Sequence, residues 1–159
     1  MAAGFRFLYR QAEGRIGPGQ WARASAWPVG IAVAMTVIAW AVAPGPRDLQ
    51  TQPFVSASII AVHAYLLVYG FALIFLSVAQ YFVSAKRFRD LGKSPNWAGL
   101  APFALLLAGA AAWFQPRSEG FMPAWAVYPF YALAAGVVVW NVVELGFIRG
   151  SAPKGARGG

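Results

Sequence analysis

The chain has 159 residues, of which 59% are hydrophobic and only 11% are charged. A soluble domain carries about 25% charged residues, so this composition excludes an ordinary soluble domain and indicates a membrane protein. Thirteen Lys and Arg against five Asp and Glu give a net charge of +8, with one His and no Cys. These counts exclude a disulfide framework and a thiolate metal site, and they leave too few ligands for a His and carboxylate metal cluster.

Long apolar windows follow one another along the chain. A hydrocarbon core of about 30 Å needs about 20 helical residues. The sequence predicts four membrane-spanning helices, at residues 24–43, 54–85, 97–114 and 124–148. The second window is about ten residues longer than a bilayer requires, so this helix is expected to tilt or to protrude. We therefore expect one all-α domain over residues 1–159, an integral membrane four-helix bundle.

The basic residues are distributed unevenly between the two sides of this bundle. Eleven of the 13 Lys and Arg residues lie in the N-terminal segment, the second connection and the C-terminal tail, and only Arg47 and Arg117 lie in the other connections. Cytoplasmic loops of membrane proteins retain the excess of Lys and Arg. Both termini are therefore predicted to be cytoplasmic, in a multi-pass protein of the bacterial inner (plasma) membrane.

The two ends of the chain are basic and poor in helix signals. Residues 1–20 begin with alternating apolar and basic side chains, which fits either a short interfacial helix or a disordered arm. The tail at 150–159 is rich in Gly and basic residues and is expected to be a flexible peptide. The arginines expected at the lipid headgroups are Arg6, Arg10, Arg23 and Arg149.

The second connection has the composition of a tight turn between helices. Gly92 suits the left-handed residue just beyond a helix C-terminus, and Ser94 can cap the next helix. The second helix is therefore expected to continue to about Leu91. On that extension Asp90 can pair with Arg87 or with the lysine before it.

Two short motifs flank the first and second predicted spans. The first is Gly14-Arg15-Ile16, and the second is Ala85-Lys86-Arg87-Phe88-Arg89-Asp90-Leu91-Gly92-Lys93-Ser94. With these motifs, and with Trp21 and Trp97 beyond them, the chain resembles the bacterial inner-membrane family of unknown function typified by YhaH and YhaI. The resemblance covers nearly the whole chain and implies a compact four-helix membrane protein. It implies no particular activity.

Glu144 is the one acidic residue expected inside a span. A charge at the centre of a bilayer costs on the order of 3 kcal/mol, so this carboxylate is expected to have a partner. We predict a structural polar clamp of Glu144, Asn141, Gln80 and Arg87, and a proton or ligand site is the alternative interpretation. The candidate partners of the carboxylate are Gln80, Arg87, Arg23 and Arg15.

A second candidate site is the cytoplasmic motif, defined as Arg15, Arg87, Arg89, Asp90, Gly92 and Lys93. In the structural interpretation, Asp90 pairs with Arg15 at the end of the second helix, and this pair connects the N-terminal segment to the turn. Its other interpretation is a docking surface for a partner or for anionic headgroups, to which each basic residue contributes about 1 kcal/mol. The two interpretations are compatible.

Small residues predict where the helices pack closely. Ala108 and Ala112 in the third span, and Ala132 and Gly136 in the fourth, have the spacing that lets helices approach each other. Close packing of the third and fourth spans is therefore expected through these residues.

The residue inventory also bears on the class of function. No nucleophile with an adjacent base can be assembled from these residues, so we expect no enzyme activity, no cofactor and no metal. The basic excess is explained by topology, so a nucleic-acid partner is not expected. The leading hypothesis is a small non-catalytic inner-membrane protein, an accessory or packing subunit of a larger membrane assembly or a lipid organiser. Its expected partners are anionic headgroups on the cytoplasmic side and a larger membrane complex or a second copy. The alternative is an oligomeric channel or transporter for a small solute or ion.

Overall fold

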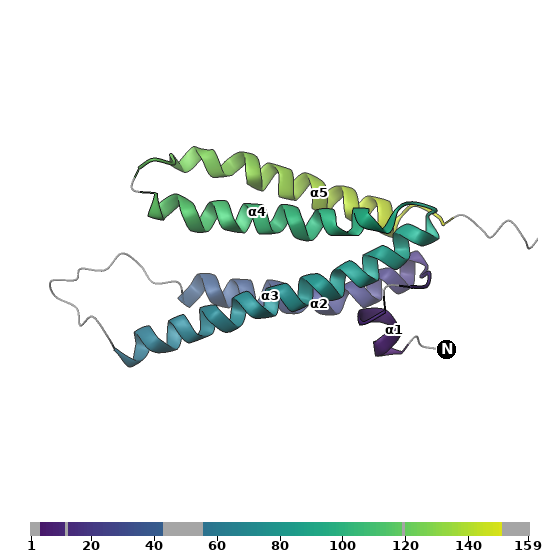
Figure 1. The fold of residues 1–159 in the computed structure, drawn as a ribbon, viewed down its shortest axis with the longest axis horizontal. Coiled ribbons are helices and arrows are strands. Elements are labelled where there is room, and N and C mark those ends of the chain that lie inside the picture. Colours follow the sequence, from purple (N-terminus) through teal and green to yellow (C-terminus); the bar gives the residue numbers. More distant parts are fainter. Residues whose placement is uncertain (1–3, 12, 43–55, 119, 151–159) are drawn as a thin grey trace, which may run out of the picture.

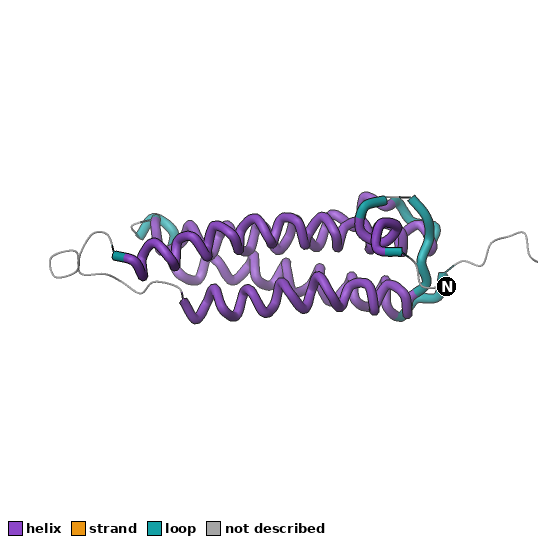
Figure 2. The backbone as a smooth tube through the Cα atoms, turned by 90° about the horizontal axis from the view of Figure 1, so that it is seen from below, coloured by secondary structure: helices purple, strands orange, loops and turns teal. Residues whose placement is uncertain are grey.

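The structure is a computed structural model that describes residues 4–11, 13–42, 56–118 and 120–150. Its long helices are α2 (Pro18–Val42), α3 (Ala57–Asp90), α4 (Leu100–Phe114) and α5 (Tyr128–Gly146). They run side by side along one axis, with α2 beside α3 and α4 beside α5 (Figures 1 and 2). The predicted all-α four-helix bundle is confirmed.

Short helical turns extend or precede the long helices. They are α1 (Phe5–Tyr9) and the 3-10 turns η1 (Pro95–Gly99), η2 (Gln115–Arg117) and η3 (Ala124–Val127). Within the described residues, four helical segments are long and apolar enough to cross a membrane, namely Pro18–Val42, Ala57–Asp90, Pro95–Arg117 and Ala124–Gly146. This is the architecture of a multi-pass membrane protein.

The helix bounds differ from the predicted spans mainly at the ends. α2 begins at Pro18 rather than at residue 24. Proline is favoured at the first helical position because its fixed φ is already helical, and because the N–H that it lacks would have no partner in the helix there. α3 has 34 residues, about 51 Å at 1.5 Å per residue. It continues to Asp90, and Gly92 follows with a φ of 72°. The predicted flexible tail lies outside the described residues apart from Gly150.

The two hairpins meet at one end of the bundle. That end carries α1, the first turns of α2, the last turns of α3, η1 and the last turns of α5, and we call it the basic end (Figure 1). Toward the opposite end the ribbons of the α2–α3 and α4–α5 pairs diverge (Figure 1). Contacts between the long helices are concentrated within each pair, whereas α5 makes only a few with α2 and α3.

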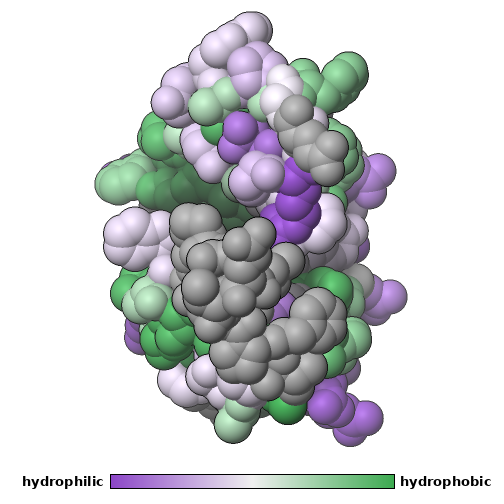
Figure 3. Space-filling view, turned by 90° about the vertical axis from the view of Figure 1, so that its left-hand side faces the viewer, coloured by the Kyte–Doolittle hydropathy of each residue, from purple (hydrophilic) through white to green (hydrophobic). Residues whose placement is uncertain are grey.

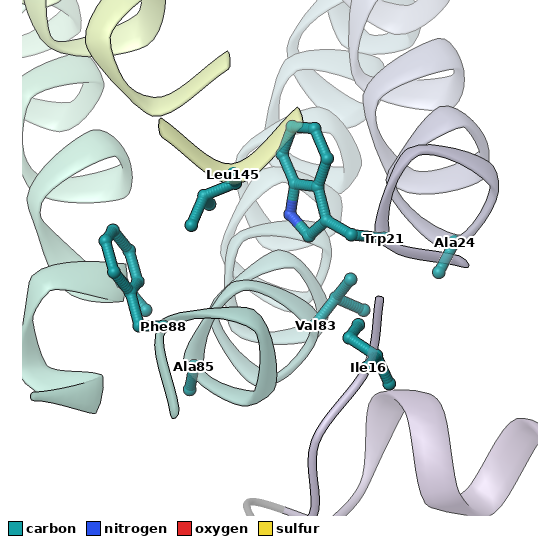
Figure 4. Close-up of a cluster of buried hydrophobic side chains, with 8 residues drawn as sticks. Ile16, Trp21, Ala24, Val83, Ala85, Phe88 and Leu145 are labelled. Carbon is teal, nitrogen blue, oxygen red and sulfur yellow. The ribbon is translucent and has the colours of Figure 1, made fainter. Parts of the chain in front are cut away.

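A cluster of buried hydrophobic side chains holds the basic end together. Leu145 of α5 packs in it with Trp21 of α2 and Phe88 of α3, and Ile16 joins from the segment before α2 (Figure 4). The full set is Ile16, Trp21, Ala24, Val83, Ala85, Phe88, Ala98 and Leu145. Because this cluster takes residues from both hairpins and from the N-terminal segment, it positions the polar groups around it.

Of the small residues that the spacing predicted, Ala108 of α4 packs between α4 and α5, whereas the two predicted residues of α5 do not. Ala104, Ala108 and Ala134 form a buried cluster between these helices, whereas Ala132 and Gly136 are exposed. Residues 132 and 136 lie on another face of α5 than residue 134, and the rotation of α5 about its axis turns the latter toward α4. The spacing indicated close packing correctly and assigned it to the wrong face of α5.

Candidate functional site: the polar cluster at the basic end

Two consecutive cations of α3, Lys86 and Arg87, are fully buried at the basic end. Charged side chains are almost never fully buried unless they are paired. Their positions in the helix point them in different directions, and each is bound to a different part of the chain. Together they connect the N-terminal segment and the end of α5 to α3.

Lys86 binds the N-terminal segment. Its Nζ donates to the backbone oxygen of Leu8 at 3.0 Å, to that of Gln11, and to that of Phe82 on its own helix at 3.3 Å. The ammonium group also stands 5.2 Å from the centroid of the Phe7 ring, within the range of a cation–π contact. Sequence analysis did not single out this lysine as a site residue. A cation four residues inside the end of an apolar helix was the available signal.

Tyr9 supplies a second anchor for the same segment. Pro28 lies inside α2 and has no N–H, so the carbonyl group of Ala24 cannot receive the usual hydrogen bond from four residues later. The Tyr9 hydroxyl donates to this oxygen at 2.9 Å. Burial raises the pKa of Tyr9, which keeps the hydroxyl protonated and able to donate. The short helix α1 is thus docked on α2 and α3, and the disordered-arm interpretation is wrong for its described residues.

Arg87 binds the other side of the cluster. Its Nε donates to the Leu145 oxygen at 2.9 Å, one Nη donates to the Ile148 oxygen, and the other pairs with the carboxylate of Asp90. The last carbonyl groups of a helix have no partner within it, so this guanidinium group caps the end of α5.

The prediction that Asp90 pairs with Arg15 is therefore wrong. Asp90 pairs with Arg87, three residues before it on α3. The reason is burial: the side chain of Arg87 is fully buried and needs a countercharge, whereas Arg15 is exposed. A carboxylate one turn away on the same helix meets that need at little entropic cost.

Glu144 does have a cationic partner, but it is Lys93. The Nζ of Lys93 lies 2.5 Å from Oε1 of Glu144, whose side chain is only 9% exposed. The left-handed turn at Gly92 brings the chain back across the end of α5, so a residue outside helix α3 reaches the carboxylate. The predicted partners were Gln80, Arg87, Arg23 and Arg15, and this assignment is corrected.

The predicted clamp of Glu144, Asn141, Gln80 and Arg87 does not form as a unit. Gln80 donates to the hydroxyl of Ser25 at 3.1 Å and to that of Ser84 at 3.3 Å, and so joins α3 to α2. Asn141 is buried, and its Nδ2 has no hydrogen-bond partner among the described residues. The polar groups are near one another along the bundle, but they divide between the α2–α3 interface and the end of α5.

The remaining residues of the cytoplasmic motif border a shallow depression at the basic end. Its volume is about 380 Å³, and it is lined by Gly14, Arg15, Arg89, Gly92 and Lys93. The two motifs noted in the sequence thus meet, although no Asp90–Arg15 pair joins them. The four arginines predicted at lipid headgroups, Arg6, Arg10, Arg23 and Arg149, are all exposed.

The arrangement as a whole is an assembly of hydrogen bonds and ion pairs that joins both hairpins and the N-terminal segment. Among the described residues, no group of three His, Cys, Asp or Glu side chains could hold a metal ion. Comparison of the chain with family models, with curated proteins and with solved structures finds no match. The resemblance to the YhaH and YhaI family therefore stays a prediction, and a function has to be argued from the chain's own residues.

Proposed function

We propose that this protein is a small, non-catalytic subunit of the bacterial inner membrane that packs against a larger membrane assembly or organises lipid. In this proposal the basic end faces the cytoplasm. The supporting observation for the orientation is that α1 and the end of α5 lie at the same end (Figure 1), which also carries Arg15, Arg89 and Lys93. Cytoplasmic loops retain such an excess of basic residues.

The observation that carries the packing role is the exposure of the apolar helices. In the most apolar 18-residue window of each spanning segment, at most 22% of the residues are buried inside the protein, and in the window of α3 no residue is buried. End-on, hydrophobic side chains reach the surface on the flanks, and an apolar recess separates the α4–α5 half from the α2–α3 half (Figure 3). Lipid or other helices must cover this surface, because apolar patches of this extent mark interaction sites.

The placement of polar groups favours this role over transport. The buried polar or charged side chains of the described residues all lie within about two turns of the basic end. A transporter instead places polar groups near the bilayer midplane. A channel would therefore have to form between copies of the chain, and that is the alternative against which the proposal is tested.

The orientation is tested by single cysteines, because the native chain has none. Suitable positions are Ser118, and Gln50 and Ser151, which lie outside the described residues. In intact spheroplasts, an impermeant maleimide should label Gln50→Cys and Ser118→Cys and leave Ser151→Cys unlabelled until the membrane is opened. Labelling of Ser151→Cys from outside would overturn the proposed orientation.

The role is tested by the size and activity of the protein extracted in mild detergent. A packing subunit should be recovered in a stoichiometric complex with a larger membrane protein, or with retained lipid, and should confer no flux on liposomes. Recovery as a homo-oligomer that conducts ions or small solutes would instead establish the channel alternative.

A further inference from the structure

The depression at the basic end is lined by cations from separate parts of the chain. Arg15 comes from the segment before α2, Arg89 from the last turn of α3, and Lys93 from the connection after it. No carboxylate is among the lining residues. Three cations brought to one concave site by tertiary folding create a local positive potential that favours an anion.

Nearby carboxylates do not neutralise this site fully. Asp90 is paired with Arg87, and Glu144 is paired with Lys93. Within the described part of the chain, no hydrogen bond or ion pair engages the exposed guanidinium group of Arg15. The carboxylate of Glu13, next to Gly14 in the chain, is exposed and is not part of the lining.

Two glycines with positive φ line the depression. Gly14 has a φ of 102° and Gly92 a φ of 72°, conformations that side chains rarely adopt. A Cβ at residue 14 would stand 2.6 Å from the ring of Phe7. The positive φ at both positions and the contact with Phe7 favour glycine there, and these two turns bring Arg15 and Lys93 to the depression.

We propose that this depression binds a phosphate group, with Arg15, Arg89 and Lys93 as its cationic lining. Arginine binds phosphate with a planar fork of donors, whereas lysine acts as a point charge. Residue 89 lies eight positions beyond Tyr81 on α3, roughly 12 Å along the axis. Aromatic side chains such as that of Tyr81 gather at membrane boundaries, and a boundary at Tyr81 puts Arg89 at the level of the headgroups in the proposed orientation. A phospholipid headgroup and a free phosphate ion can therefore both reach the site, and the lipid source rests on the proposed membrane orientation.

The test uses the full chain in detergent micelles, with and without added phosphatidylglycerol. Retained phospholipid is measured per protein after size exclusion, and binding of inorganic phosphate is measured by titration. The test variant is Arg15→Gln. Arg117→Gln is the matched control, because it removes the same charge from an exposed arginine of η2, outside the lining. Arg15→Lys keeps the charge but loses the fork, and its binding should fall between those of wild type and Arg15→Gln.

We expect Arg15→Gln to weaken phosphate binding about tenfold, the factor that 1.4 kcal/mol corresponds to, while Arg117→Gln binds as wild type does. Retention of phosphatidylglycerol that excess inorganic phosphate does not displace identifies the headgroup as the source. Binding of inorganic phosphate without lipid preference identifies a soluble phosphate, and this result would stand even if the orientation were wrong. Equal binding by wild type and Arg15→Gln, or equal losses in Arg15→Gln and Arg117→Gln, would overturn the site.

Discussion

The hydroxyl group of Tyr9 provides the sharpest test of how α1 is held. It donates to the Ala24 oxygen at 2.9 Å, and that oxygen lacks its usual helical donor because residue 28 is proline. Leaving a buried carbonyl unsatisfied costs about 1–3 kcal/mol, and this bond is only partly buried. We therefore expect Tyr9→Phe to weaken the docking of α1 by about 1–2 kcal/mol. That corresponds to a factor of about 5–30 in the equilibrium for local opening.

Hydrogen exchange of the α1 amides, followed by mass spectrometry in micelles, measures this opening. The same substitution is repeated with Pro28→Ala, which restores an N–H that can reach Ala24. In that background Tyr9→Phe should accelerate exchange less, because the carbonyl has another donor. Tyr128→Phe, an exposed tyrosine of α5, is the control and should change nothing. An equal acceleration with Pro28 and with Ala at position 28 would refute the role assigned to the proline.

Three further predictions concern the ion pairs and the buried lysine. Lys86→Met should accelerate exchange in residues 4–11 by about tenfold or more, because hydrogen bonds from charged donors contribute about 1.5–3 kcal/mol; unchanged exchange would contradict the anchoring role. Glu144→Gln should lower the free energy of unfolding in micelles by about 1 kcal/mol. Adding Lys93→Gln to this variant should lower it little further, because the ion pair is already lost. Additive losses would show that Glu144 and Lys93 do not interact. Asp90→Asn and Arg15→Gln should have additive effects on the protease sensitivity of the N-terminal segment, because Asp90 and Arg15 are not paired in the structure. A non-additive result would indicate that the two side chains do interact.

The local features of the fold could be predicted from the sequence. The four apolar windows determine the long helices, since each is long enough to satisfy its backbone hydrogen bonds within itself. Gly92 adopts a φ of 72°, and the hydroxyl of Ser94 accepts from the N–H of Asn96 at 3.4 Å. Such turns and caps depend on neighbouring residues in the chain, so their chemistry is visible in the sequence.

The polar contacts depended on information that only the tertiary structure contains. The helices are apolar on nearly all sides, so no stripe in the sequence indicates which face of α5 meets α4 or α3. A rotation of one helix by a single residue, about 100°, changes which carboxylate a given cation can reach. For this reason the partners of Glu144 and Asp90 were predicted wrongly, although the need of Glu144 for a partner was predicted correctly. Burial of Lys86 and Arg87 likewise follows from the way the N-terminal segment and the end of α5 fold onto α3, which brings together residues 58 to 78 positions apart.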